Sequence, residues 1–472
     1  MNLTLRDVIL CLTGIVNNGP DSDRLVAAVR TDSRAVVPGD LFFCLKGERF
    51  DAHDFASQVS DAGALAIVAS RELPGLKCPV IVVADTEKAL GWLARFWRDR
   101  FAASGGKVLA VTGTAGKTTV KELLAQTLAS VLPVAKNHKN FNNQVGLPLS
   151  ILAATGEEKA WVMEAGISKP HDMDELGEII APDLAVVLNI GPAHLEGLGD
   201  LAGVAKAKAA LLKHVKPGGL GLSCMDYPEL WTEAQAALPG VLGFSAKDSF
   251  AKYYARFEEA LPGGRGLFEI IVDGQAFWAE LPACGAHFAE NAAAVAGACH
   301  LLGLSPDQIA SGLAGACLPD QRFCFAEAGA WCVVDDSYNA NPLSMRRSIE
   351  AARLMAGEAP LVLVLGDMKE LGACAAKAHQ DLGAVIKAVK PVAVFYQGEF
   401  AADVARSAEG VAVTPVTEPT QVMAALAKMP APVDGVRGTL LVKGSRSCHM
   451  EAYSKALLEG LSATASTNGG QS

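Results

Sequence analysis

Short hydrophobic runs separated by polar turns recur along the chain and divide it into three blocks. The first block, residues 1–103, contains β-like runs at residues 41–45, 65–69 and 80–84. Their length and the turn residues between them are typical of strands, and residues 87–101 have helical spacing. The pattern predicts a small α/β unit that ends at the Ser-Gly-Gly linker of residues 104–106.

The second block, residues 104–319, alternates hydrophobic strands with helices. An apolar strand is expected at residues 107–111, followed by a glycine-rich turn. After the turn, a set of side chains shares one face of a helix that ends before Pro133, namely Val120, Leu123, Leu124, Thr127, Leu128 and Val131. Buried strands are expected again at residues 160–163 and 184–190. This alternation predicts a doubly wound parallel sheet.

The third block, residues 320–472, repeats the strand–helix alternation. Strands are expected at residues 331–334, 361–365, 392–396 and 439–442, with helices at residues 343–355 and 379–389. The pattern predicts a second, Rossmann-like α/β unit. Residues 462–472 are small and polar, and we expect this tail to be disordered.

Composition narrows the class of protein. The length of 472 residues agrees with three domains of about 150 residues each. A net charge of −10 argues against a general nucleic-acid-binding surface. No apolar run approaches the roughly 18 residues that a membrane span needs, and the first residues lack the basic start of a signal peptide. The cysteines form no CxxC pair, so we expect reduced thiols in a cytoplasmic protein.

The strongest chemical motif lies between the strand at residues 107–111 and the helix that follows. It consists of Gly113, Thr114, Ala115, Gly116, Lys117, Thr118 and Thr119. The backbone N–H groups of such a loop bind a phosphate chain. Lys117 would contact the β- and γ-phosphates, and the Thr118 hydroxyl would bind Mg²⁺. It is a variant phosphate loop, because Val111 stands where the usual pattern has its first glycine. The alternative is a glycine-rich turn with a solvated lysine.

Four further side chains of the second block are candidate metal ligands or reactive groups. Glu164 ends a predicted strand, where an α/β ATPase holds a metal, although it could be a charged strand terminus. His194 follows another strand, where it could be a ligand or a loop histidine. Lys206 and Lys208 lie in an apolar helical stretch; a buried lysine can lose its proton, but both could equally be solvated.

Two polar segments of the third block follow predicted strands. Residues 335–342 read DDSYNANP, and residues 443–446 read KGSR. Because ligands bind at the carboxyl edge of a parallel sheet, both segments are candidate binding loops. The alternative for residues 335–342 is an Asx-rich turn and helix cap.

Together these residues resemble the Mur ligase family. The resemblance is carried by the loop 113–119, Glu164, residues 189–196, Gly285-Ala286-His287 with Asn291, Arg322 and Asp336. It is also carried by residues 335–342, 366–372 and 443–446. In the first block, residues 32–34, 38–42 and 47–55 are similar to the uridine-binding domain of two members, and residues 142–148 fit as well.

The resemblance implies an α/β protein of three domains: a small uridine-binding domain, a central P-loop-type ATPase domain and a C-terminal Rossmann-like domain. It implies an ATP-dependent amide ligase that joins D-alanyl-D-alanine to UDP-N-acetylmuramoyl-tripeptide in peptidoglycan synthesis. Lys117, two Mg²⁺ ions and Arg322 would neutralise phosphate charge. Thr118 and Glu164 would hold one metal, and His194 with a carbamylated Lys208 the other. We expect a monomer in which the third block closes over ATP.

Further binding roles are implied by the same resemblance. The nucleotide would contact His287, Asn291, Asp336, Tyr338 and Asn339. The amide-forming substrates would contact Ser33, Arg34, Gly47, His53, Asn142, Asn143, Asn341, Lys443, Ser445 and Arg446.

Three alternatives stay open. Another ligase of the same family, such as a glutamate-adding folate enzyme, would not need a uridine-binding first block. A P-loop kinase or motor ATPase would be expected to have the glycine missing at Val111. A catalytically inactive binding protein would not need Lys117, Thr118 and Glu164.

Overall fold

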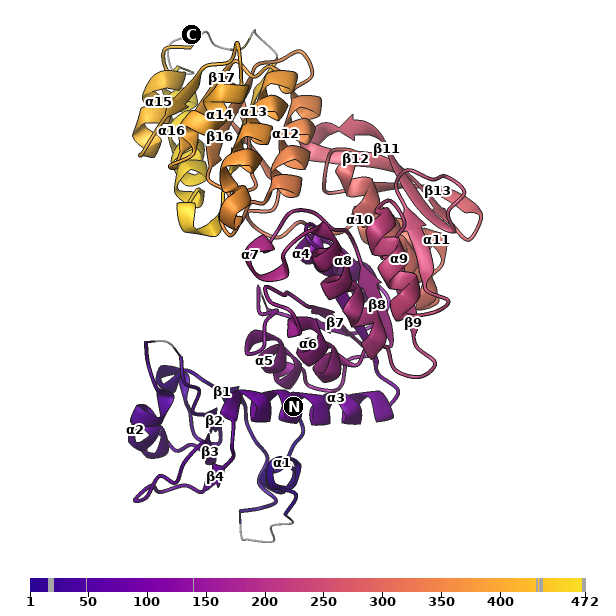
Figure 1. Cartoon of the computed structure of the whole chain (residues 1–472), viewed down its shortest axis with the longest axis vertical. Helices are drawn as coiled ribbons and strands as arrows, with labels where there is room; N and C mark the ends of the chain where they lie inside the picture. The colour runs from indigo at the N-terminus through magenta and orange to yellow at the C-terminus, as the bar shows by residue number, and fades with distance from the viewer. Residues whose placement is uncertain (16–20, 48, 139, 430–431, 433–435, 469–472) are drawn as a thin grey trace. The chain divides into compact units, whose positions relative to one another are not determined.

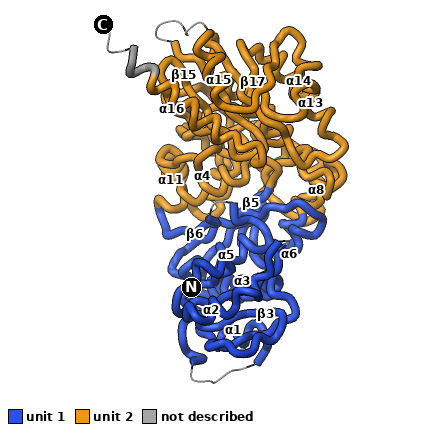
Figure 2. Tube along the Cα trace, turned by 90° about the vertical axis from the view of Figure 1, so that its left-hand side faces the viewer, with its two compact units in different colours: residues 1–112, 131–186, 210–221 blue, residues 113–130, 187–209, 222–472 orange. Residues whose placement is uncertain are grey.

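The structure is a computed structural model, and it describes residues 1–15, 21–47, 49–138, 140–429, 432 and 436–468. The chain divides into two compact units, residues 1–112, 131–186 and 210–221 on the one hand and residues 113–130, 187–209 and 222–472 on the other (Figure 2). Three sheets run through these units, with four, nine and six strands (Figure 1). The block boundaries at residues 103 and 319 stay a prediction.

The N-terminal sheet is parallel and forms from short apolar segments. Its order is β1-β2-β3-β4, with the bounds Val29–Arg30, Leu41–Phe43, Ala66–Ala69 and Val80–Val82. Phe42 and Ile67 pack with Val59 of helix α2 (Ala56–Asp61) in its core. Helix α1 (Leu5–Thr13) begins at a capping box on Thr4, and α3 (Thr86–Ala103) begins at a cap on Asp85. The predicted strands and the long helix are confirmed.

The nine-stranded sheet has the order β13-β12-β11-β10-β9-β8-β5-β7-β6. In the first unit, its strands β5 (Lys107–Thr112), β7 (Ala160–Glu164) and β6 (Val134–Lys136) are parallel. Strand β8 spans Leu184–Val187. It ends before the predicted residue 190, because residues 188–190 leave the strand to support a neighbouring loop: the Thr114 N–H donates to the carbonyl of Asn189.

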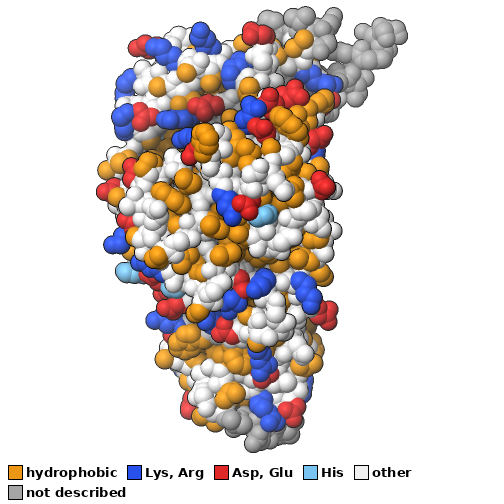
Figure 3. All heavy atoms as spheres, turned by 90° about the vertical axis from the view of Figure 1, so that its right-hand side faces the viewer, with side chains coloured by type: hydrophobic (Ala, Val, Ile, Leu, Met, Phe, Trp, Pro, Cys, Tyr) orange, Lys and Arg blue, Asp and Glu red, His pale blue; other side chains and the backbone are white. Residues whose placement is uncertain are grey.

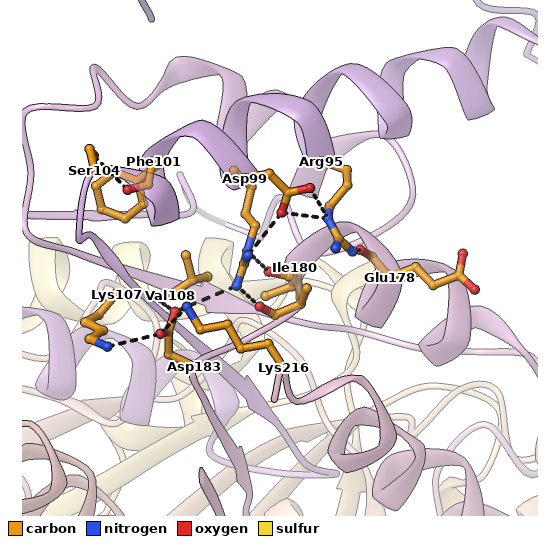
Figure 4. Close-up of polar contacts among 12 residues, drawn as sticks. Arg95, Asp99, Phe101, Ser104, Lys107, Val108, Glu178, Ile180, Asp183 and Lys216 are labelled. Carbon is orange, nitrogen blue, oxygen red and sulfur yellow. Dashed lines mark hydrogen bonds and ion pairs between the residues drawn. The ribbon is translucent and has the colours of Figure 1, made fainter. Parts of the chain in front are cut away.

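A buried carboxylate fixes the start of β5. Asp183, just before β8, accepts a hydrogen bond from the Val108 N–H at 3.0 Å and pairs with Lys216 at 2.5 Å and Lys107 at 3.3 Å (Figure 4). Arg98 of α3 also approaches it at 3.7 Å. Burial alone would raise the pKa of Asp183, but the bonds from Lys216 and the Val108 N–H outweigh it and lower that pKa. The network holds the strand that leads into the phosphate loop.

At the β13 end of its strand order, the nine-stranded sheet contains antiparallel strands that the sequence pattern did not predict. Strands β9 and β10 are parallel, whereas β11, β12 and β13 form an antiparallel meander. Their bounds are Leu220–Cys224, Leu242–Ser245, Tyr253–Leu261, Arg265–Val272 and Gln275–Leu281. Side chains of β12 alternate between buried and half-buried, as expected for a sheet with one exposed face. The turn Pro262–Gly264 joins β11 to β12.

The C-terminal sheet has the order β14-β15-β19-β16-β17-β18. Only the β14–β15 pair is antiparallel in it, so the predicted Rossmann-like parallel core is confirmed. The strand bounds are Cys324–Ala328, Trp331–Asp335, Gly438–Lys443, Leu361–Gly366, Ala393–Gln397 and Val413–Pro415. Helices α12 (Pro342–Ala356) and α13 (Ala375–Val389) correspond to the helices predicted at residues 343–355 and 379–389. The fold class is therefore the expected mixed α/β class.

Two expectations need correction. Helix α4 (Lys117–Ala129) ends before Val131, whose side chain is 42% exposed, so Val131 does not share the buried face. Helix α16 (Glu451–Asn468) continues through residues 462–468, which we expected to be disordered. No Gly or Pro interrupts those residues before Gly469. Residues 469–472 lie outside the described part of the chain.

Surface and redox features complete the picture. On the face shown in Figure 3, Lys and Arg side chains are intermixed with Asp and Glu. All eleven cysteines are free thiols. Among the described residues, we find no helix long and apolar enough to span a membrane.

Candidate active site

The phosphate loop lies between β5 and α4, and its backbone requires glycine at Gly116. Gly116 precedes the first residue of α4 with φ of +80°, in the left-handed region. A Cβ atom there would lie 2.7 Å from Oδ1 of Asn291. At Gly113, a Cβ would lie 2.9 Å from that of Leu188. The loop therefore presents backbone N–H groups at the start of a helix, as an anion site requires.

Asn189 holds the middle of this loop by three hydrogen bonds. Its carbonyl accepts from the Thr114 N–H at 3.0 Å. Its side-chain Oδ1 accepts from the Ala115 N–H at 2.8 Å, and its Nδ2 donates to the Ala115 carbonyl at 3.0 Å. The Thr114 hydroxyl in turn accepts from the Gly191 N–H at 3.2 Å. The loop is thus braced from the end of β8.

The structure brings Lys117, Thr118 and Arg322 together at the loop. Nζ of Lys117 donates to the Gly113 carbonyl at 2.8 Å and reaches that of Thr114 at 3.4 Å. Arg322 Nη2 donates to the Thr118 hydroxyl at 3.3 Å. Thr119 is buried one residue further along α4. Two cations and a hydroxyl therefore surround the place where a phosphate chain would lie.

Lys208 is a buried lysine near the loop, whereas Lys206 is exposed. Lys208, on α8 (Leu201–Ala209), is 2% exposed. Burial lowers its pKa well below the usual value, and the charge of Lys117 lowers it further. Burial and the charge of Lys117 both act against the protonated form of Lys208. Of the two lysines that the sequence left open, Lys208 has the reactive environment.

His194 lies before the short helix α7 (Leu195–Leu198), with φ of +54°. Its Nδ1 pairs with Glu370 at 2.7 Å. Burial is the main cause that lowers its pKa, and the charges of Lys117 and Lys208 act in the same direction, against Glu370. A neutral imidazole is the form that binds metals.

Glu164 belongs to the first unit, at the end of β7. It is 2% exposed and is the register partner of Val111, just before the phosphate loop in sequence. Its Oε1 accepts from Asn142 Nδ2 at 2.7 Å, and its N–H donates to Asn137 Oδ1 at 2.5 Å. Its buried Oε2 has no hydrogen-bond partner within the described residues. Asn142 thus orients Glu164, and Asn143 Oδ1 accepts from the N–H of Gly146, the first residue of α5 (Gly146–Ala153), at 2.8 Å. The substrate roles of Asn142 and Asn143 stay a prediction.

The two binding loops of the C-terminal sheet meet through an ion pair. Lys443 at the end of β19 donates to Asp336 at 2.5 Å and to the Asn339 carbonyl at 3.0 Å. Burial lowers the pKa of Lys443, although Asp336 opposes it. The Ser445 hydroxyl donates to the Ala340 carbonyl at 3.3 Å. The two segments that sequence placed at one sheet edge are therefore joined.

The ends of these loops approach Gln321 and the phosphate loop. The Arg446 N–H donates to Asn339 Oδ1 at 3.3 Å, and its side chain donates to Gln321 at 3.2 Å. Asn341 caps α12 and reaches the Thr114 carbonyl at 3.4 Å. Tyr338 lies under Arg322.

His287 and Asn291 lie one turn apart on helix α10 (His287–Leu301). Oδ1 of Asn291 is buried and has no hydrogen-bond partner in the described chain. Burial is the first cause that lowers the pKa of His287, with Arg347 and Lys443 adding to it. Phe323 packs edge-on against His287 at 5.8 Å. Both candidate nucleotide residues thus face the part of the chain that carries Arg322 and the loop.

The candidate substrate-binding residues of the N-terminal block each make contacts with residues close to them. Arg34 forms a two-pronged pair with Asp32 at 2.9 and 2.6 Å, and Ser33 begins the turn Ser33–Ala35 between them. His53 is buried, with Nδ1 on Asp51 at 2.5 Å and Nε2 accepting from the Ser70 N–H at 3.0 Å. The Gly47 N–H donates to the Phe50 carbonyl. Both ring nitrogens of His53 are engaged by neighbouring residues, and its role at the substrate stays a prediction.

Sequence reasoning missed a buried cluster behind the loop. Glu290 accepts hydrogen bonds from Asn189, from Tyr227 and from Arg347. Its spacing from His287 and Asn291 on α10 was visible, but a lone Glu in an alanine-rich helix carries no motif signal.

Magnesium, which the resemblance implies, is compatible with this chemistry. Within the described ranges, no group of three His, Cys, Asp or Glu side chains forms a ready metal cluster. Mg²⁺ in nucleotide sites is typically held by one or two carboxylates plus substrate phosphates. The buried, unpaired Oε2 of Glu164 and the Thr118 hydroxyl supply hard oxygen atoms of that kind.

The chain matches three family models in succession. They are the Mur ligase family catalytic domain at residues 25–98, the Mur ligase middle domain at residues 111–299, and the Mur ligase glutamate ligase domain at residues 321–446. Together they cover residues 25–446 except for residues 99–110 and 300–320.

Known relatives are similar over the same extent. The UDP-N-acetylmuramoyl-tripeptide–D-alanyl-D-alanine ligases of Escherichia coli and Bacillus subtilis are 35% and 31% identical, covering 95% and 97% of this chain and 97% and 98% of theirs. Crystal structure I of MurF from Acinetobacter baumannii has a TM-score of 0.87 at 29% identity, covering 97% of this chain and 99% of that one. MurF from Thermotoga maritima in complex with ADP has a TM-score of 0.83 at 28% identity, covering 93% and 99%. As its motifs predicted, the chain belongs to the Mur ligase family.

Proposed function

We propose that this protein is an ATP-dependent amide ligase that joins D-alanyl-D-alanine to UDP-N-acetylmuramoyl-tripeptide, a step of peptidoglycan precursor synthesis. The products are the UDP-linked pentapeptide, ADP and phosphate. The relatives named for this reaction are similar over nearly the full length of the chain. The observation that carries the proposal is the phosphate loop, at which Lys117, Thr118 and Arg322 converge.

The chemistry needs activation of a carboxylate. The terminal carboxylate oxygen of the tripeptide attacks the γ-phosphorus of ATP, the bond to ADP breaks, and an acyl phosphate forms. The amine of D-alanyl-D-alanine then attacks the acyl carbon, loses a proton, and phosphate leaves. Because phosphoryl transfer depends on positioning and charge neutralisation, Lys117 and Arg322 are the expected catalytic cations.

Two magnesium ions would be held by this chain's residues and would supply positive charge to the phosphates. Thr118 and Glu164 would hold one. His194 and Lys208 would hold the other, with Lys208 carbamylated by CO₂ so that an amine becomes a carboxylate. The burial and the lowered pKa of Lys208 support this assignment, because a neutral amine is the form that reacts with CO₂.

The three blocks take separate binding roles. Residues 1–103 bind the UDP-sugar through Ser33, Arg34 and the stretch from Gly47 to Phe55, which includes His53. Residues 104–319 bind ATP, with His287 and Asn291 in the nucleotide pocket. Residues 320–472 close over ATP and bring Asp336, Tyr338 and Asn339 to the nucleotide and Asn341, Lys443, Ser445 and Arg446 to the substrates. Because one copy of the chain supplies all of these groups, we propose that the working form is a monomer. We also propose that it works in the cytoplasm.

Another ligase of the same family is the second candidate function. A folylpolyglutamate synthase of Mycobacterium tuberculosis has a TM-score of 0.60 at 17% identity and covers 78% of this chain, a likeness of fold alone. The N-terminal match at residues 25–98 favours a uridine-binding Mur ligase over a folate enzyme.

The decisive experiment measures ADP release from the full chain with UDP-N-acetylmuramoyl-tripeptide, with and without D-alanyl-D-alanine. Rapid release and pentapeptide formation only with the dipeptide support the assignment. Release that depends on glutamate and a folate, and not on the dipeptide, would replace it.

A further inference from the structure

A buried charge pair lies behind the phosphate loop, outside the residues assigned to ATP or metals. Glu290 on α10 is 3% exposed. Its Oε2 accepts from Nη2 of Arg347 at 2.7 Å and from the Tyr227 hydroxyl at 2.9 Å. Arg347 lies on α12, and Nη2 of Arg347 also donates to that hydroxyl at 2.5 Å. A buried carboxylate is tolerated only with partners of this kind.

The other oxygen of Glu290 reaches the residue that braces the loop. Its Oε1 accepts from Nδ2 of Asn189. The same Asn189 amide donates to the Ala115 carbonyl and accepts from the Ala115 N–H. An Asn amide can rotate by half a turn and exchange its oxygen and nitrogen. A carboxylate accepts only from the nitrogen, so Glu290 selects the orientation in which Asn189 satisfies both polar groups of Ala115.

Helix α12 makes two further contacts with the phosphate loop and the residues that follow β8. Its cap Asn341 reaches the Thr114 carbonyl at 3.4 Å, and the Leu343 side chain packs on Gly191, where a Cβ would lie 3.0 Å from that of Leu343. Leu343 and Arg347 are four residues apart and therefore share one face of α12. The face of α12 that touches the loop region is the face that supplies the counter-ion of Glu290.

We propose that Glu290 is a positioning residue for the phosphate loop through Asn189, and that Arg347 makes this positioning depend on the docking of α12. With α12 docked, Glu290 is paired with Arg347 and fixed on Asn189. With α12 undocked, Glu290 loses its counter-ion and its hold on the amide weakens. The phosphate loop then binds nucleotide tightly only when α12, which belongs to the third block, is docked. This coupling rests on the proposed use of ATP.

The test compares full-length variants by ADP binding in calorimetry. Arg347→Met should weaken ADP affinity about tenfold, because the buried carboxylate is left unpaired and withdraws from Asn189. The double variant Glu290→Gln with Arg347→Met should bind ADP more tightly than Arg347→Met alone, since a neutral Gln needs no counter-ion and still accepts from Asn189. Arg347→Lys should recover part of the affinity. Arg346→Met, an exposed neighbour on the same helix, is the matched control and should stay within about twofold.

Two readouts separate positioning from general loss of structure. In Arg347→Met, hydrogen exchange of the Ala115 amide should accelerate, while the KM for UDP-N-acetylmuramoyl-tripeptide changes less than about twofold and the KM for ATP rises. Wild-type ADP affinity in Arg347→Met, or strictly additive effects in the double variant, would overturn the coupling. ADP binding does not depend on the amide product. A wild-type protein that binds ADP but forms no pentapeptide would therefore overturn the proposed function and leave the coupling to be decided by the variants.

Discussion

The guanidinium of Arg322 stacks 3.9 Å above the centre of the Tyr338 ring while its Nη2 points to the Thr118 hydroxyl. Gln321 and Phe323, the residues on either side, both have φ of +61°, in the left-handed region that non-glycine residues rarely adopt. The backbone around Arg322 is not in a relaxed conformation, and the face of the Tyr338 ring therefore sets the direction of the Arg322 side chain.

Replacing Tyr338 by Leu should remove that surface and lower kcat by about threefold to tenfold, the range of a partly desolvated cation–π contact. Tyr338→Phe keeps the ring and should stay near wild type. Steady-state kinetics at saturating ATP check both. Equal losses in the Leu and Phe variants would mean that the hydroxyl, not the ring face, is what matters.

Lys117→Ala should abolish ATP turnover, with a loss of at least about 100-fold, because a cation on the transferring phosphate is lost. Circular dichroism should be unchanged, since the Lys117 side chain donates to the Gly113 and Thr114 carbonyls of its own loop. Phosphate release by the folded variant at a near-wild-type rate would remove the loop from the mechanism.

Lys208→Ala should lose most activity, because the carboxylate that carbamylation provides is lost. Added formate should restore part of it, since a small carboxylate can enter the space left by the side chain with the right charge. The measurement is ligase rate against formate concentration.

Lys206→Ala is the matched control, on the same helix but exposed. It should keep nearly full activity and show no response to formate. If the responses of the two variants were exchanged, the carbamylated residue would be Lys206.

Asp183→Asn should destabilise the protein by about 3 kcal/mol at neutral pH, as expected when a buried charge network loses its central anion. The pKa of Asp183 is lowered in the folded state, so its contribution is present above the unfolded value near 3.8 and is lost as pH falls through the lower folded value. Urea unfolding should show the variant approaching wild type below about pH 4.

Asp99→Asn serves as the control, because Asp99 is half exposed and pairs with the partly exposed Arg95 as well as with the buried Arg98. It should cost less than about 1 kcal/mol. A similar loss for both variants would mean that Asp183 acts no differently from a surface ion pair.

The sequence predicted the features that rest on local pattern. The strand–loop–helix around Lys117, the strands of the two parallel sheets and the placement of residues 335–342 and 443–446 at one sheet edge follow from periodicity and motif spacing. The role of Asn142 beside Glu164 could not follow from spacing, because it depends on how β7 and a distant turn meet.

The same limit explains the other differences. Glu290 and Asn189 are separated by 101 residues, and no local rule relates a Glu in an alanine-rich helix to an Asn at a strand end. The antiparallel strands β11–β13 have one exposed face, which makes their pattern weaker than that of buried parallel strands. Val131 fitted the helical period but lies beyond the last turn, where periodicity no longer reports burial.

The bracing of the phosphate loop also sets an order of events during synthesis of the chain. Ala115 can form its hydrogen bonds with Asn189 only after 74 more residues have been synthesised. Asn189 in turn needs Glu290, and the counter-ion of Glu290, Arg347, follows after another 57 residues. Contacts so distant in sequence form only after the entropy of closing long loops has been overcome. On the ribosome, the parallel sheet of residues 29–82 has all its strands early, whereas a nascent chain that ends before Arg347 carries the phosphate loop without its final support. The proposed coupling therefore implies that the polypeptide reaches its full affinity for nucleotide only late in its translation.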